Sequence, residues 1–79
     1  MSSETETRIR AIVERVAKKA QAGFSCDADI YRELGVESTA ALDLLLSLEE
    51  EFGVTLDDGA FAQALTVSAL CALVEKEAG

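Results

Sequence analysis

Apolar residues follow a helical spacing in the first quarter of the chain. They recur at i, i+3, i+4 and i+7, which is the pattern of an amphipathic helix. Ser3 followed by Glu6 forms a capping-box pair, so we expect the helix to begin near Glu4 and to end at Gly23. The residues that form its apolar face are Ile9, Ile12, Val13, Val16, Ala17 and Ala20.

A second helix is predicted from Ser38 to about Phe52, and it contains more apolar residues than a single buried face accounts for. One face has the spacing of a buried stripe. Leu42 and Leu46 follow Ser38 at i+4 and i+8, so they lie on a different edge, next to the serine. The core face consists of Ala41, Leu44, Leu45, Leu48 and Phe52, and a neighbouring polar edge consists of Asp43, Ser47 and Glu50.

The connection between these helices covers residues 22–37, which is long for a segment without structure of its own. We expect Asp27 to cap a short turn through Tyr31–Leu34. Three apolar residues are spaced to hold the connection against the core: Ile30, Leu34 and Val36.

The last third of the chain predicts one short helix and one longer helix. Asp57 and Asp58 can cap a helical turn that ends near Ala64, and Thr66 can cap the final helix. The apolar stripe of that helix contains Val67, Leu70, Cys71, Leu73 and Val74. No alternating strand pattern extends beyond a few residues. The sequence therefore predicts an all-α bundle of three main helices plus one short helix.

Length and charge narrow the functional classes. The 79 residues suffice for one small domain, 1–79, in which we expect residues 1–4 to form a flexible N-terminus. Seven basic and fifteen acidic residues give a formal net charge of −8. This charge repels nucleic-acid phosphates and anionic lipids, and it steers the domain towards basic surfaces on other proteins.

Catalytic and metal-binding chemistry find little support. The chain has no His, which excludes Ser-His-Asp and Cys-His catalysis and imidazole metal ligands. Of the two cysteines, we expect Cys71 to be buried and Cys26 to lie in a loop, and neither has metal spacing. We expect no metal and no enzymatic activity. The polar first residues and the lack of a membrane-length apolar run favour the cytoplasm.

Ser38 carries the most informative local pattern. A serine at a helix start commonly caps the first turn, because its oxygen accepts a hydrogen bond from a free amide N–H. The alternative is a covalent anchor, since the free N–H groups and the helix dipole also favour a phosphate at this place. The residues around Ser38 decide between these alternatives.

These residues resemble the phosphopantetheine attachment segment of acyl carrier proteins. Leu34 and Gly35 precede Ser38 as in that segment, an acid (Glu37) stands directly before the serine, and Asp43 takes the place of the acid found one turn later. The similarity continues through Leu48–Val54, which resembles the end of the family's second helix, and through Thr66–Val67, which resembles the start of its last helix.

The resemblance implies a function. A phosphopantetheinyl transferase would transfer 4'-phosphopantetheine from coenzyme A to the Ser38 hydroxyl, and the thiol of that arm would hold an acyl or aminoacyl group as a thioester. A loading ligase or transferase and downstream biosynthetic enzymes, as in fatty acid or polyketide biosynthesis, would dock on the second helix of a monomer. The implied docking residues are Glu37, Thr39, Leu42, Asp43, Leu46 and Glu50.

Two substitutions depart from the family pattern. Glu37 replaces the usual aspartate and keeps the charge, whereas Thr39 replaces a leucine that contacts partner enzymes. We interpret Thr39 as a sign of a specialised discrete carrier rather than the housekeeping fatty-acid carrier. Two alternatives stay open: an aminoacyl carrier, and a carrier-like acidic protein-interaction module that is never modified.

Overall fold

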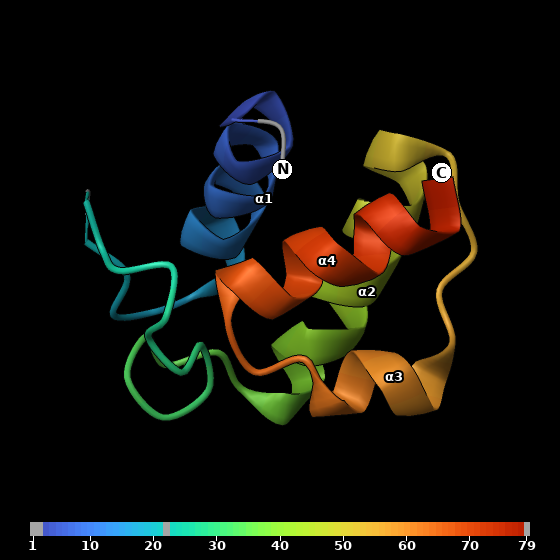
Figure 1. The fold of residues 1–79 in the computed structure, drawn as a ribbon. Coiled ribbons are helices and arrows are strands. Elements are labelled where there is room, and N and C mark those ends of the chain that lie inside the picture. Colours follow the sequence, from blue (N-terminus) through green and yellow to red (C-terminus); the bar gives the residue numbers. More distant parts are fainter. Residues whose placement is uncertain (1–2, 22, 79) are drawn as a thin grey trace.

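The computed structural model describes residues 3–21 and 23–78 and contains four helices within them (Figure 1). These described residues contain no strand. The prediction of an all-α bundle with three main helices and one short helix is confirmed. The helices are α1 (Ser3–Val16), α2 (Ser38–Phe52), α3 (Asp58–Gln63) and α4 (Val67–Ala78).

The core lies where α1, α2 and α4 meet, and α3 packs beside α4 (Figure 1). The expected core face of α2 is confirmed: Leu44, Leu45 and Leu48 are buried, while Ala41 and Phe52 are partly buried against the core. The other helices contribute residues that the apolar periodicity had also placed inside. These are Ile9 and Val13 from α1 and Val67, Leu70, Cys71 and Val74 from α4.

The first helix is shorter at its C-terminus than the sequence predicts. The apolar spacing suggested an end at Gly23, but α1 ends at Val16. Beyond that point the Lys19 N–H donates to the Leu34 carbonyl at 2.8 Å instead of continuing the helical ladder. A Cβ atom on Gly35, which has a φ of +76°, would lie 3.1 Å from the Lys19 side chain. The end of α1 is therefore determined by its contact with the segment that precedes α2.

The start of α1 is close to the prediction. The helix begins at Ser3, one residue before the expected Glu4. The expected flexibility of residues 1–4 stays a prediction. Residues 1–2 of the predicted flexible segment lie outside the described residues. The side chain of Ser3 is likewise outside the described part of the chain, so the predicted capping box with Glu6 stays a prediction.

The connection before α2 is held against the core as expected, but a different aspartate caps its turn. The Asp29 carboxylate accepts hydrogen bonds from the N–H groups of Tyr31 and Arg32 at 2.8 and 2.9 Å. The prediction of Asp27 in this role was wrong, because the free N–H groups lie two and three residues after Asp29. Asp27 instead accepts from the Ser68 hydroxyl at 3.4 Å. The predicted core contacts of this connection, Ile30, Leu34 and Val36, are all buried.

The caps of the last two helices follow the sequence closely. Asp57 accepts from the Ala60 N–H at 2.9 Å and is the N-cap of α3, whereas Asp58 is its first helical residue. Thr66 accepts from the Ala69 N–H at 3.1 Å and so caps α4. Only Asp57 of the predicted aspartate pair therefore caps α3.

The two cysteines are free thiols in different surroundings. Cys71 is fully buried in α4, as predicted. Burial raises the pKa of its thiol to about 11, and the nearby acid Glu6 adds to this shift. Cys26 is only half-buried, and its sulfur accepts a hydrogen bond from Arg10 at 3.1 Å.

Candidate functional site

Ser38 is the first residue of α2 and its side chain is exposed. The N-cap position belongs to Glu37, whose backbone is extended and whose side chain makes no capping hydrogen bond. The Glu37 carbonyl accepts from the Ala41 N–H at 2.9 Å, which closes the first helical turn. Ser38 is therefore not the N-cap of this helix, although a serine at a helix start often is.

The backbone N–H groups of the first turn of α2 therefore donate no hydrogen bond to the side chain at the N-cap. Such donors, together with the positive end of the helix dipole, stabilise an anionic group nearby. The hydroxyl of Ser38 is exposed beside these donors. A phosphate ester formed on this hydroxyl would fit the local electrostatics without displacing an existing cap.

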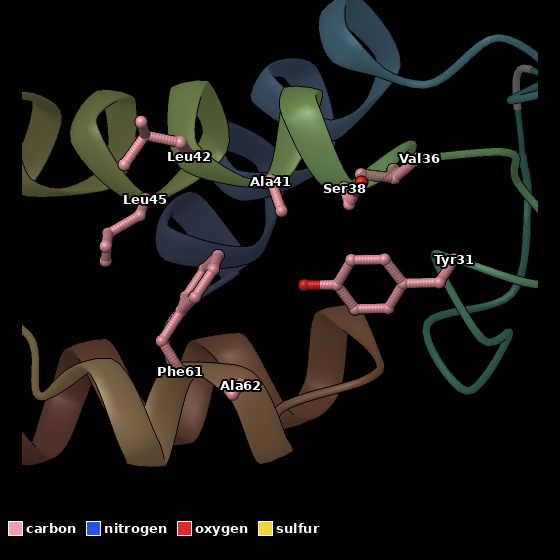
Figure 2. A pocket seen from close by; sticks show the side chains of 8 residues that line it. All are labelled: Tyr31, Val36, Ser38, Ala41, Leu42, Leu45, Phe61 and Ala62. Atoms are coloured by element: carbon pink, nitrogen blue, oxygen red, sulfur yellow. The ribbon is translucent and has the colours of Figure 1, made fainter.

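A pocket of about 540 Å³ opens beside Ser38, between α2, α3 and the preceding connection (Figure 2). Its walls are mainly apolar, and the ring of Tyr31 extends from the connection towards Phe61 of α3 (Figure 2). The pocket is lined by Tyr31, Val36, Ser38, Ala41, Leu42, Leu45, Phe61 and Ala62. The exposed serine thus lies at the edge of a space that could receive an apolar group.

Tyr31 contributes a phenol hydroxyl to this mainly apolar pocket. Desolvation by burial raises the pKa of this phenol above its usual value, and the negative charge of Asp29 raises it further. Tyr31 therefore stays neutral at physiological pH. In that form the hydroxyl can both donate and accept a hydrogen bond.

The sequence pattern gives no indication of this pocket. Tyr31 and Phe61 come from the connection and from α3, and only tertiary packing brings them to α2. The helical spacing of α2 indicated that Leu42 lies on the same edge as Ser38, but it gave no information about the opposite wall. The pocket therefore depends on long-range packing rather than on a local motif.

The predicted docking residues of α2 form two adjacent stripes. Leu42 and Leu46 are 61% and 50% exposed, which is high for large apolar side chains. The first stripe follows i+3 and i+4 spacing and contains Thr39, Leu42, Leu46 and Glu50, all of them exposed. The second stripe is the predicted polar edge: Asp43 and Ser47 face α1 because both contact Arg15, and Glu50 lies where this edge borders the first stripe.

Two of the predicted docking acids form ion pairs within the chain. The Lys18 ammonium lies 2.9 Å from the Glu37 carboxylate. The Arg15 guanidinium lies 3.9 Å from Asp43 and also donates to the Ser47 hydroxyl, which in turn donates to Asp43 at 3.3 Å. Neither cation could be inferred from the local sequence pattern, because the pairs join residues that are far apart along the chain.

Residues 3–21 and 23–78 contain neither a metal-binding cluster nor a membrane-spanning helix. No group of three or more Cys, Asp or Glu side chains is arranged to hold a metal ion there. None of the described helices is long and apolar enough to cross a membrane. The pocket beside Ser38 and the exposed face of α2 are therefore the features to explain.

Comparisons with known proteins match almost the whole chain to one family. The sequence model of the family described as "Phosphopantetheine attachment site" matches residues 7–74. An acyl carrier protein of Trieres chinensis is 30% identical over 77 residues, which cover 98% of this chain and 96% of the relative. One from Thermotoga maritima is 27% identical over the full length of both chains. Acyl carrier protein 2 of Pseudomonas aeruginosa is 33% identical over 55 residues, or 70% of each chain.

Proposed function

This chain belongs to the family of phosphopantetheine-binding carrier proteins, and from that premise we propose that Ser38 bears the arm on which it carries an acyl group. Members of the family are carriers rather than catalysts, so the chain is not an enzyme. Membership also implies a covalently attached 4'-phosphopantetheine. The thiol of that group supplies the thioester chemistry when it is bound.

The state of Ser38 is the observation that carries the proposal. Its hydroxyl is exposed and is not the N-cap of α2, so a transferase can reach it without breaking a capping bond. The amide N–H groups of the first turn can stabilise the negative charge of a phosphodiester on this oxygen. The residues present therefore fit the group that the family implies.

An acyl cargo fits the surroundings of Ser38 better than an aminoacyl cargo. The pocket next to the serine has apolar walls from Val36, Leu45 and Phe61. Burying an aliphatic chain there gains about 0.8 kcal/mol per CH₂ group at most, whereas burying a charged amine would cost energy. We therefore propose an acyl carrier of fatty acid or polyketide biosynthesis, which we expect to act as a monomer. Two free thiols fit a reducing compartment such as the cytoplasm.

Partner enzymes would dock on the exposed face of α2. The phosphopantetheinyl transferase, the acyl-loading enzyme and the downstream enzymes would use the apolar side chains of Leu42 and Leu46, with Glu50 beside them. Thr39 presents a smaller apolar surface than leucine at the same exposed place. This difference supports a specialised pathway with matched partners.

The test is the intact mass of the protein after incubation with coenzyme A, Mg²⁺ and a broad-specificity phosphopantetheinyl transferase. We expect the wild type to gain one phosphopantetheine and Ser38→Ala to gain none. Ser68→Ala, which changes a serine of α4 rather than of the docking helix, serves as the matched control and should be modified like the wild type.

The second candidate function is an unmodified acidic protein-interaction module. Thr39 favours it, because the loss of an apolar contact next to Ser38 weakens recognition by a transferase. Absence of any mass gain in a folded sample, also with a transferase from the same source organism, would replace the carrier proposal with this one.

A further inference from the structure

Cations from α1 and the segment just after it line one side of the docking face. Lys18 pairs with Glu37 beside the proposed attachment serine, and Arg15 contacts Asp43 and Ser47 one to two turns further along α2. Arg15 lies in α1 and Lys18 just after it, and the family resemblance connects neither residue with docking. They lie against acids that the sequence would assign to contacts with a basic partner.

These ion pairs contribute little to stability. The side chains of all four charged residues are between 57% and 69% exposed. Pairs of this kind contribute about 0–1 kcal/mol, because water and salt screen them. Their main effect is therefore on the local charge of the surface that a partner protein would contact.

A partner protein bound to the docking face would lie close enough to Arg15 and Lys18 to interact with their charges. Leu42 and Leu46 lie next to Asp43 on the same helix, so a partner that covers the two leucines also approaches Arg15. Charges interact over about 8 Å at physiological ionic strength before salt screens them. A lysine or arginine of the partner placed opposite Asp43 or Glu37 would consequently be repelled by the cation already there.

We propose that Arg15 and Lys18 are specificity-determining residues of the docking face. They select protein partners whose docking surface has an apolar centre for Leu42 and Leu46 and carboxylates, rather than lysines or arginines, on the side facing α1. This inference rests on the proposed function, because it specifies which enzymes the carrier serves. The net charge of −8 still attracts cationic proteins from a distance, but the contact itself rejects a partner with cations on that side.

The first test measures kcat/KM for phosphopantetheine loading by a broad-specificity transferase that docks through a basic surface. The double variant Arg15→Gln/Lys18→Gln removes both cations. Arg32→Gln/Lys76→Gln, which changes one exposed cation before α2 and one in α4, is the control, and both variants take the net charge from −8 to −10. We expect the first variant to be loaded about 3- to 10-fold faster than the control at low ionic strength, with the difference fading as salt rises.

A second measurement does not depend on modification. In the Ser38→Ala background, the affinity for a synthetic octalysine peptide should increase more with Arg15→Gln/Lys18→Gln than with the control pair. Equal effects of the two pairs would show that only net charge matters and would overturn the proposal, as would no effect or a weaker affinity. Failure of the wild type to be loaded would count against the proposed function alone, since the peptide experiment still tests the two cations.

Discussion

At the residue scale, the position of Ser38 distinguishes helix capping from covalent attachment, which the serine and the helix pattern alone do not. A serine before an apolar helix is compatible with capping and with attachment. The structure places Glu37 at the cap and Ser38 one residue later, so the hydroxyl has no structural hydrogen bond at the helix start. Thr66 shows the opposite case, because its side chain accepts from the Ala69 N–H.

This contrast predicts different stabilities for two alanine variants. Ser38→Ala should change the free energy of unfolding by less than about 0.5 kcal/mol, as expected for an exposed residue without a partner. Thr66→Ala should cost about 1 kcal/mol, because it removes the cap of α4. Urea unfolding followed by circular dichroism measures both values. A loss for Ser38→Ala as large as that for Thr66→Ala would mean that Ser38 stabilises the helix after all.

The buried thiol of Cys71 predicts how stability depends on pH. Its pKa is raised from 9.0 to about 11 in the folded state, so between these values the unfolded chain loses the proton while the folded chain keeps it. The stabilising contribution is complete below pH 9 and is lost as pH rises through about 11. We expect the urea midpoint of the wild type to fall more steeply over this window than that of Cys71→Ala. If the urea midpoints of the two proteins fell in parallel with pH, the raised pKa of Cys71 would be contradicted.

At the element scale, α2 was predicted with its observed bounds, whereas α1 was predicted too long. The apolar spacing of Ala17 and Ala20 continues the pattern of α1, but periodicity records only side chains. The Lys19 N–H is taken by the Leu34 carbonyl, and this long-range hydrogen bond cannot be inferred from spacing. The error in the turn cap has a local cause, because Asp27 and Asp29 lie two residues apart and only the backbone conformation shows that Asp29 accepts from Tyr31 and Arg32.

Gly35 provides a test of the contact between the connection and the segment that follows α1. Gly35 and Gly23 both have a positive φ, so alanine strains the backbone at either place. Only at Gly35 would the added Cβ also meet Lys19 at 3.1 Å, whereas nothing lies within 4 Å of it at Gly23. We expect Gly35→Ala to reduce the free energy of unfolding by about 1 kcal/mol more than Gly23→Ala, which is a typical cost of overpacking. Equal losses in urea unfolding would show that the contact is loose.

At the scale of the whole molecule, the sequence predicted the bundle and one wall of the site. The helix that carries Ser38 and Leu42 was expected from its own periodicity. The opposite wall, with Tyr31 and Phe61, depends on how the connection and α3 pack against α2. The cations opposite Glu37 also come from such packing, so the site was predictable only where it is local to α2.

The pocket predicts that cargo changes the stability of the domain. Octanoyl loading on the arm should raise the Tm of the wild type by about 4–8 °C for each kcal/mol of apolar burial. Ala62→Trp places a large ring at the pocket wall, so the increase should largely disappear. Ala72→Trp, at an exposed position of α4, is the matched control and should keep it. Equal increases in all three proteins, measured by scanning calorimetry, would place the octanoyl chain outside the pocket.

The bond between Lys19 and Leu34 has a further consequence for transport. It holds the backbone against the segment that follows α1, four residues before Ser38, so the point from which an arm would extend is a fixed pivot. The volume that the terminal thiol explores is then set by the length of the arm alone. Once a partner is docked, the effective concentration of the thiol at an active site depends on the distance from this pivot. Enzymes that share the carrier must therefore place their active sites within the same radius of their docking surfaces.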